Sequence, residues 1–166
     1  MGQKKKYVLM VFLGIFIGIV LKLFIFDITK VSGTSMEPTI KNGDTIFINK
    51  LEYGFSKPLG ESLYFSWKEP KKGDIVIYIY NNKTVVKRVV ATEYEKLEYS
   101  FNNGYSVNVG SLTIPLTERQ YQRMKYDSVV PENTVFCVGD NYLESVDSRD
   151  YGFVFVESIL GKVLCQ

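Results

Sequence analysis

The sequence predicts a mainly β domain attached to one N-terminal transmembrane helix, and three observations lead to this fold class. The chain has 166 residues, of which 46% are hydrophobic, and this is enough to bury the core of one domain. Twelve Tyr and 11 Phe accompany apolar runs rich in Val and Ile, and these residue types favour strands over helices. An apolar run at residues 7–26 has the length that a helix needs to cross a bilayer.

The apolar run at 7–26 predicts an uncleaved membrane anchor. Only Lys22 interrupts it, near enough to one end for its ammonium group to reach the membrane interface. The alternative is a cleaved signal peptide, which would need a shorter apolar core followed by small residues at a cleavage site. Lysines at 4–6 precede the run, so the positive-inside rule predicts a cytoplasmic basic tail at 1–6 and an extracytoplasmic domain at 27–166.

Charge and cysteine usage limit the partners and the redox chemistry. The formal net charge is only +2, and no basic face beyond the N-terminal lysines is evident, so we expect no binding to nucleic acid. The only cysteines, Cys137 and Cys165, lie in apolar runs typical of strands. An oxidising exterior would permit a disulfide between them, but we favour two buried free thiols.

The first elements after the anchor are expected to be short. A strand at 28–31 should lead into a turn that contains Ser35, and a strand at 45–48 should follow the turn Asn42-Gly43-Asp44. Residues 53–70 place aromatic side chains among Gly, Ser and Pro, which predicts a loop. This loop is either a satellite core or a patch that rests on the membrane interface, where Trp and Tyr are favoured.

The rest of the chain predicts two hairpins, a short helix and the strands that complete the sheet. The first hairpin joins 75–80 to 84–90 through Asn81-Asn82-Lys83, and the second surrounds Asn102-Asn103-Gly104. The remaining elements are a helix at 117–125, a core strand at 135–138, a polar loop at 139–152 and a segment at 153–165 that closes the sheet.

Ser35 and Lys87 are the candidates for chemistry in a chain that has no histidine. The absence of histidine excludes a Ser-His-Asp triad and any His-based zinc site, so a serine hydrolase would need another base, and lysine is a known one. Lys87 shares a strand face with Val85 and Val89, and burial there would lower the pKa of its amine enough to make it a base. The alternatives are an ordinary turn at Ser35 and a solvated lysine at a sheet edge.

The polar loop at 139–152 admits two interpretations. Its short polar side chains could cap backbone groups and fasten a crossing loop. Its acidic residues, which are Asp140, Glu144, Asp147 and Asp150, could instead bind calcium, but the spacing of an EF-hand and its central glycine are missing. We therefore expect neither a metal nor a cofactor.

Taken together, these segments resemble the bacterial type I signal peptidases, the membrane-anchored Ser-Lys proteases, and the likeness is to the Gram-positive kind. The resemblance covers the anchor and, in the order of the family, Ser35-Met36-Glu37-Pro38-Thr39, Gly73-Asp74-Ile75-Val76, Lys87-Arg88-Val89, Gly139-Asp140-Asn141, Ser145, Asp147-Ser148-Arg149 and Gly152-Phe153-Val154. It implies a partly open antiparallel β-barrel, with a variable β subregion at about 91–134.

The resemblance also implies roles for individual residues. Ser35 would be the nucleophile, Lys87 the general base, and Ser145 the hydroxyl that orients the lysine amine. Asp147 and Arg149 would form a supporting ion pair. The oxyanion and the extended substrate are expected near the Ser35 amide and four further residues, which are Gly33, Thr34, Met36 and Val85. Gly33 stands where some relatives carry a serine, so the second oxyanion donor is left open.

The implied function is removal of signal peptides from secretory preproteins at a membrane, by cleavage after a small-x-small motif. The implied partners are signal peptides and the lipid bilayer. The sequence departs from the family pattern at two places, which are Val90-Ala91-Thr92-Glu93-Tyr94 after the lysine motif and Tyr142 after Gly139-Asp140-Asn141. These departures leave two alternatives, a general signal peptidase and a specialised one with few substrates. The rival functions are a non-catalytic assembly factor for surface pili and a self-cleaving repressor. The assembly factor would typically lack Ser35 or Lys87, and the repressor would need a helix-turn-helix.

Overall fold

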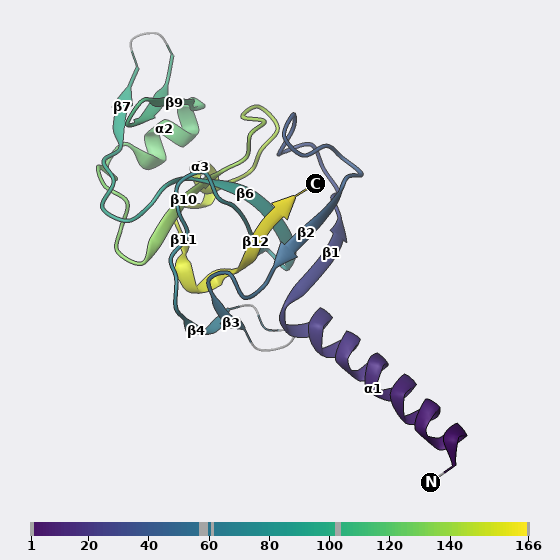
Figure 1. Ribbon diagram of the computed structural model, residues 1–166. Helices are drawn as coiled ribbons and strands as arrows, with labels where there is room; N and C mark the ends of the chain where they lie inside the picture. Colours follow the sequence, from purple (N-terminus) through teal and green to yellow (C-terminus); the bar gives the residue numbers. More distant parts are fainter. Residues whose placement is uncertain (1, 57–59, 61, 102–103, 166) are drawn as a thin grey trace.

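The computed structural model describes residues 2–56, 60, 62–101 and 104–165, and it consists of one projecting helix and a β domain (Figure 1). The helices are α1 (Gln3–Phe24), α2 (Glu118–Met124) and α3 (Ser148–Tyr151), with a 3-10 turn η1 (Val156–Ser158). The strands are β1 (Phe26–Lys30), β2 (Thr45–Asn49), β3 (Gly54–Ser56), β4 (Leu63–Ser66), β5 (Ile75–Tyr80), β6 (Lys83–Ala91), β7 (Glu98–Ser100), β8 (Ser106–Val109), β9 (Leu112–Pro115), β10 (Thr134–Val138), β11 (Val154–Phe155) and β12 (Ile159–Cys165).

The main sheet confirms the predicted mainly β fold with a partly open arrangement. Its seven strands run in the order β1-β2-β12-β5-β6-β10-β11, and each neighbouring pair is antiparallel. The end strands β1 and β11 do not pair with each other within the described residues, so the sheet does not close there. β3 with β4, and β7 with β8 and β9, form two small separate sheets.

Helix α1 is long and apolar enough to cross a membrane, and its side chains face outward without packing against the domain core. It differs from the predicted span of 7–26 at both ends. It begins at Gln3, because the lysines at 4–6 are good helix formers and continue the helix. It ends at Phe24, because Phe26 already belongs to β1, where it pairs with Asn49.

The predicted hairpins are confirmed where the structure describes them. β5 and β6 pair from Ile75↔Arg88 to Tyr80↔Lys83, and the connecting Asn81 and Asn82 both have positive φ, at 48° and 57°. This is the geometry of a type I′ turn, which matches the twist of two antiparallel strands and which Asn tolerates. The strands of the second hairpin, β7 and β8, also pair, whereas the predicted turn residues Asn102 and Asn103 lie outside the described residues.

The predicted helix at 117–125 is present as α2, and its N-terminus explains its position. Thr117 accepts a hydrogen bond from the Gln120 amide, and the Gln120 side chain accepts one in return from the Thr117 amide, which forms a capping box. With β7, β8 and β9, α2 builds a small unit that Figure 1 places at the far end of the domain from α1.

One predicted segment is wrong. Residues 53–70 are not simply a loop, because β3 and β4 form an antiparallel pair there. Residues 153–165 join the main sheet as predicted, but as two strands: β11 lies at the edge beside β10, and β12 lies inside the sheet between β2 and β5. The break between them is η1, which redirects the chain.

The core packs on both faces of the main sheet. One cluster gathers Tyr53, Val76, Tyr78, Val89 and Cys137, and a second gathers Met36, Ile40, Ile46, Ile48 and Ile77. Cys137 is a buried free thiol, and burial raises its pKa, so it remains a neutral packing residue. The side chain of Cys165 lies outside the described part of the chain.

Candidate active site

Ser35 lies in the turn that follows β1, and that turn is held by its neighbours on both sides. Gly33, which has a φ of 115° that disfavours other residues, donates its amide hydrogen bond to the side chain of Asn42. On the other side, Met36 is 2% exposed and packs into the core cluster with Ile46. The turn is therefore fixed by burial after Ser35 and by hydrogen bonds before it.

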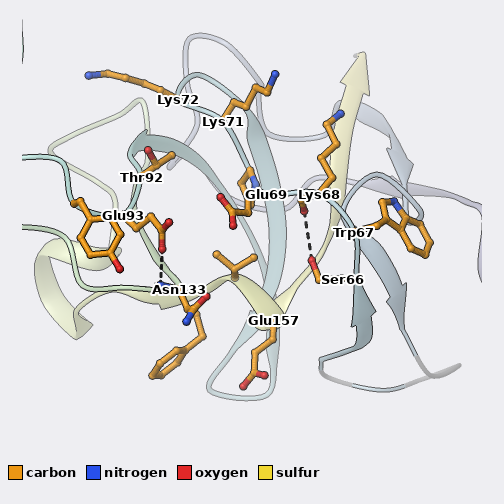
Figure 2. Close-up of a pocket in the computed structure, with 14 residues that line it drawn as sticks. Ser66, Trp67, Lys68, Glu69, Lys71, Lys72, Thr92, Glu93, Asn133 and Glu157 are labelled. Atoms are coloured by element: carbon orange, nitrogen blue, oxygen red, sulfur yellow. Dashed lines mark hydrogen bonds between the residues drawn. The ribbon is translucent and has the colours of Figure 1, made fainter.

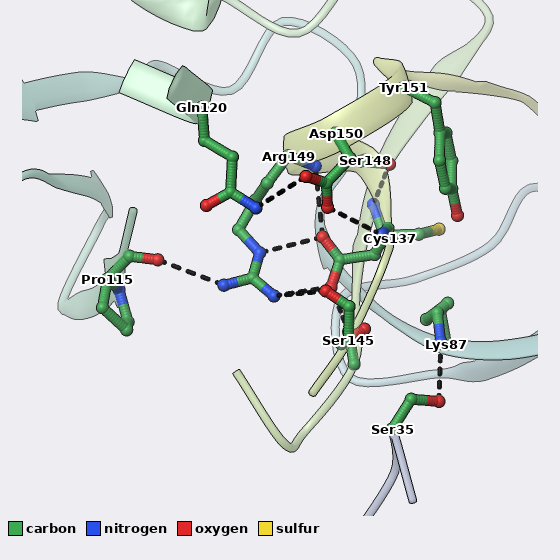
Figure 3. Close-up of polar contacts among 12 residues, drawn as sticks. Ser35, Lys87, Pro115, Gln120, Cys137, Ser145, Ser148, Arg149, Asp150 and Tyr151 are labelled. Carbon is green, nitrogen blue, oxygen red and sulfur yellow. Dashed lines mark hydrogen bonds and ion pairs between the residues drawn. The ribbon is translucent and has the colours of Figure 1, made fainter. Parts of the chain in front are cut away.

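Lys87 reaches Ser35 from the middle of β6. Its side chain is 3% exposed, and its Nζ lies 2.7 Å from Ser35 Oγ, within hydrogen-bonding distance (Figure 3). The two residues are 52 positions apart in the chain, so only the fold brings them together. The predicted strand face is confirmed, because Val85 and Val89 pack in one cluster while Val86 packs in the other.

The surroundings of Lys87 favour its neutral amine. Burial is the main cause, and the positive charge of Arg149 adds to it, so the pKa of Lys87 is lowered from the ordinary lysine value of 10.5. The charge of Asp147 opposes this shift without cancelling it. A lysine with an ordinary pKa is neutral in only about one molecule in 2,500 at pH 7, so a lowered pKa increases the population able to accept a proton.

The loop after β10 holds the backbone of the Ser35 turn directly. The amide of Asn141 donates to the Ser35 carbonyl at 3.0 Å, and its side chain donates to the Thr34 carbonyl at 3.2 Å. Gly139 allows this close approach, since a Cβ at that position would lie 2.4 Å from the Ser35 carbonyl oxygen. The family resemblance singled out the Gly139-Asp140-Asn141 motif, but the sequence did not predict that Gly139 and Asn141 contact the Ser35 turn.

Asp147 and Arg149 form the predicted ion pair, and both side chains are almost completely buried. Arg149 Nε donates to Asp147 Oδ1, and Nη2 donates to Oδ2, each at 2.9 Å. The same carboxylate accepts from the Arg149 amide, which caps α3, and from the Gly139 amide at 3.0 Å. The pair thus connects α3 to the glycine that lies against Ser35.

Residues of the segment at about 91–134, which the family resemblance implies to be variable, also contact this ion pair. Arg149 Nη1 donates to the Pro115 carbonyl at 3.1 Å, and the Gln120 side chain donates to Asp150 Oδ1 at 2.9 Å (Figure 3). Asp150 in turn accepts from the Asp147 amide and completes the cap of α3. The sequence offered no signal for these contacts, because they join residues about 30 positions apart.

Ser145 lies beside the site, but the contact with Lys87 implied by the family resemblance is not formed. Its Oγ is buried and has no hydrogen-bond partner among the described residues. It is confined by Gly139, since a Cβ there would lie 2.3 Å from Ser145 Oγ. A buried hydroxyl without a partner is uncommon, and here it is next to the Ser35 turn.

Arg88 and Asp140 form a second ion pair, which the sequence did not assign. Arg88 Nη2 lies 2.7 Å from Asp140 Oδ2, and Nε lies 2.8 Å from Oδ1. Burial alone would raise the pKa of Asp140, but the hydrogen bonds from Arg88 and Thr39 and the Arg88 charge outweigh it and lower the pKa. Because Arg88 follows Lys87 on β6 and points to the opposite face, the pair fastens the loop to the strand that carries Lys87.

A small groove reaches Ser35 and Lys87. Its volume is about 200 Å³, and its lining includes Gly33, Met36, Ile77 and Val85, whereas Thr34 is not part of it. Among the described residues, β6 pairs with β10 only at Arg88, Val89 and Ala91, so residues 83–87 have a strand partner there on the β5 side alone. The open edge of β6 therefore borders the groove.

A larger cavity of about 1110 Å³ lies elsewhere, between the segment after β4 and the start of η1. Figure 2 shows that its wall mixes lysines with the carboxylates of Glu69, Glu93 and Glu157. None of the residues predicted for the site lines this cavity. We therefore place the candidate chemistry in the small groove.

Known proteins resemble this chain over most of its length. The family described as signal peptidase, peptidase S26, matches residues 4–166. A signal peptidase I of Bacillus caldolyticus is 30% identical over 92% of this chain and 85% of its own length, and one of Buchnera aphidicola (Schizaphis graminum) is 24% identical over 89% and 69%. A crystal structure of a signal peptidase I from Enterococcus faecalis V583 is 26% identical and covers 60% of this chain and 99% of its own, with a TM-score of 0.41. The chain belongs to the signal peptidase family, peptidase S26.

Proposed function

We propose that this protein is a serine endopeptidase that removes signal peptides from secreted preproteins, with Ser35 as nucleophile and Lys87 as general base. One observation carries the proposal. Ser35 Oγ lies 2.7 Å from the Nζ of a buried lysine whose pKa is lowered, in a chain without histidine. Membership of the signal peptidase family supplies the substrate class.

The reaction proceeds through an ester. The neutral amine of Lys87 accepts the proton of the Ser35 hydroxyl while Oγ attacks the scissile carbonyl. As the tetrahedral intermediate collapses, the C–N bond breaks and the Lys87 ammonium gives its proton to the leaving amine. Water then attacks the Ser35 ester while Lys87 accepts a proton from that water. The bond between the acyl carbon and Ser35 Oγ breaks, the Lys87 ammonium returns the proton to Oγ, and the new carboxyl end departs.

The groove suits an extended peptide. An open strand edge at 83–87 can pair with substrate backbone, and a groove of about 200 Å³ beside it can receive the side chains near the cut. The amide of Ser35 has no acceptor among the hydrogen bonds of the described residues, so it is free to donate to the oxyanion. We assign Gly33, Met36 and Val85 to the substrate-binding wall and Thr34 to the adjoining backbone.

The buried groups around the pair act by positioning. Asp147, which is paired with Arg149, accepts a hydrogen bond from the Gly139 amide, and Asn141 in the same loop donates to the backbone of the Ser35 turn. We propose that the unpartnered hydroxyl of Ser145 bonds to the Lys87 amine during the reaction, when proton transfer has weakened the bond between Lys87 and Ser35.

The anchor would place this chemistry where preproteins emerge. We propose that α1 crosses the bilayer once, with residues 1–6 in the cytoplasm and residues 27–166 outside as the catalytic domain, in which about 91–134 form the variable subregion. Confinement to one surface raises the effective concentration of a membrane-bound substrate.

The test is cleavage of a preprotein by the full-length chain in detergent, beside Ser35→Ala and Lys87→Ala. We expect the wild type to cut after a small-x-small motif and both variants to be inactive while retaining their circular dichroism spectra. Asp140→Ala, which leaves both reacting groups in place, is the matched control for general damage near the site. Activity that survives in either dyad variant would refute the residue assignment, and a folded but inactive wild type would favour a binding role.

A further inference from the structure

The loop after β10 carries two apolar side chains that face outward. Leu143 is 94% exposed and Val146 is 61% exposed, although most other members of this loop are polar. Single exposed apolar residues are ordinary. Here, however, both side chains line one pocket of about 300 Å³, which shares no lining residue with the small groove or the large cavity. Two such side chains beside one pocket indicate a surface that contacts an apolar group.

The pocket lies between this loop and the small unit that contains α2. Its opposite wall includes Pro115 and Leu116 around the end of β9 and Gln120 in α2. The polar side chains at the pocket have partners within the chain, because Gln120 donates to Asp150 and Arg149 donates to the Pro115 carbonyl. The pocket therefore offers apolar contacts from both walls, and its buried charge is already paired.

The residues that give the pocket its apolar character are specific to this sequence. Tyr142 packs against the core cluster that includes Leu116, and its ring lies 5.6 Å from the Arg149 guanidinium. The ring is thereby held on the inner side of the loop, and the next side chain, Leu143, is left on the outer side. Tyr142, Leu143 and Val146 all lie outside the motifs that carry the family resemblance, so the pocket is not a consequence of those motifs.

The turn that carries Leu143 begins at a residue bonded to Ser35. The Asn141 amide donates to the Ser35 carbonyl at 3.0 Å, and the Asn141 carbonyl accepts from the amides of Glu144 and Ser145 at 3.2 and 3.0 Å. Any displacement of this turn would therefore be transmitted to the nucleophile. The pocket is thus built on the same backbone as the candidate active site.

Ser145 connects the pocket with the candidate active site. It lines the pocket, and its Oγ lies against Gly139 at the Ser35 turn. Figure 3 shows Ser145 between the pair formed by Ser35 and Lys87 and the Pro115 carbonyl. Because the described part of the loop contributes nothing to the lining of the small groove, the groove and the pocket approach Ser35 from different sides.

We propose that this pocket binds an apolar side chain of the preprotein on the leaving-amine side of the cut. The inference rests on the proposed function and assigns the small groove to the residues before the cut. A chain that continues past Ser35 then crosses the loop that carries Leu143. Five extended residues span about 16 Å, and Leu143 is only two residues from Asn141, so the first five residues after the cut can reach the pocket. The contact makes the enzyme selective among preproteins that share one small-x-small motif.

The test is a set of peptides that share one sequence before the cut and have Ser at the five positions after it. Each of these positions in turn is replaced by Leu or by Asp, and cleavage by the full-length protein in detergent gives kcat/KM. We expect Leu at one position to raise kcat/KM about tenfold over Ser, because an apolar contact in a pocket supplies discrimination of that order. Asp at the same position should give no gain.

Variants of the loop identify the pocket as the source of this preference. The preference is the ratio of kcat/KM for the Leu peptide to that for the Ser peptide within one variant, so a general loss of activity cancels. We expect Leu143→Ser and Val146→Ser to reduce the ratio to about twofold or less. Leu164→Ser, which removes a side chain that is 51% exposed on β12, is the matched control and should retain the ratio. Leu143→Arg should instead favour the Asp peptide over the Ser peptide, a gain that damage to the loop would not produce.

Binding distinguishes failure of the pocket from failure of the proposed function. Fluorescence anisotropy of labelled peptides with the Ser35→Ala protein measures affinity without cleavage, and we expect the Leu peptide to bind more tightly than the Ser peptide. Cleavage without a preference for Leu at any position, or with a preference that survives in both loop variants, would overturn the pocket and leave the peptidase intact. Binding that depends on Leu, with no cleavage by the wild type, would support the pocket and overturn the proposed peptidase. Absence of both would overturn both.

Discussion

The loop at 139–152 and the β3–β4 hairpin depart from the usual distribution of side chains in opposite directions. The loop buries charges, since Asp147 is fully buried and Arg149 is 1% exposed. The hairpin exposes aromatic rings, since Phe65 and Trp67 are more than half exposed. Stability alone favours neither arrangement, because a buried charge requires pairing and an exposed ring forgoes burial.

The two regions differ in where the interaction partners of their unusual side chains lie. Every hydrogen bond of Asp147 and Arg149 ends within the chain, and the network reaches the turn that carries Ser35. The hairpin has its free face toward the outside, next to the proposed anchor. Changes in the loop should therefore alter stability and rate in any medium, whereas changes in the hairpin should matter only in a membrane.

The largest effect is expected for Asp147→Ala. It would leave the Arg149 charge buried without a partner, which we expect to lower the free energy of unfolding by about 3–5 kcal/mol. Urea unfolding of the detergent-solubilised protein measures this. Asp140→Ala breaks the more exposed pair with Arg88, and we expect it to lose only about 1 kcal/mol. Equal losses would mean that burial does not distinguish the two pairs.

Gly139→Ala tests whether the loop positions Ser35. The added Cβ would lie 2.4 Å from the Ser35 carbonyl oxygen and 2.3 Å from Ser145 Oγ, so the turn or the loop must move. Because a displacement of about 1 Å can reduce a rate about 100-fold, we expect kcat for preprotein cleavage to fall by that order while KM changes little. An unchanged kcat would show that the two segments move independently.

Ser145→Ala separates positioning from stability. Removing a buried hydroxyl that has no partner in the described part of the chain should leave the free energy of unfolding unchanged or raise it by about 1 kcal/mol. If the hydroxyl orients the Lys87 amine during proton transfer, kcat should nevertheless fall about tenfold or more. Loss of stability together with unchanged kcat would assign Ser145 a structural role only.

Phe65→Ser should have the smallest effect in detergent. The ring is 63% exposed, so we expect the free energy of unfolding to change by no more than about 0.5 kcal/mol and cleavage of a soluble peptide to be unaffected. The same variant should process a membrane-bound preprotein in vesicles more slowly than the wild type. Equal rates for Phe65→Ser and the wild type in vesicles would show that the exposed Phe65 ring has no role in processing at a membrane.

Local patterns in the sequence predicted the local structure well. The apolar run predicted α1, Asn81-Asn82 predicted the β5–β6 hairpin, and the helix expected at 117–125 is present as α2. Alternation along β6 also predicted that Lys87 lies on the face of Val85 and Val89, and the sequence motifs indicated Ser35 as its partner.

Long-range pairing could not be predicted in the same way. Nothing local distinguishes an edge strand from a central one, so the separate positions of β11 and β12 were missed. The β3–β4 hairpin was missed because Gly, Ser and Pro are scattered through the segment and weaken the strand pattern. Contacts such as Arg149 with Pro115 depend on how two distant segments pack, which no spacing in one sequence specifies.

The most direct test of the Ser35–Lys87 assignment is the pH dependence of kcat/KM for preprotein cleavage by the full-length protein. Lys87 acts as a base only when neutral, and its neutral fraction grows as the pH rises. Since burial lowers the pKa of Lys87, we predict that activity rises along a single limb whose midpoint lies below the ordinary lysine value of 10.5. A midpoint at or above that value, or an unaltered limb in Lys87→Ala, would contradict the assignment of Lys87 as the base.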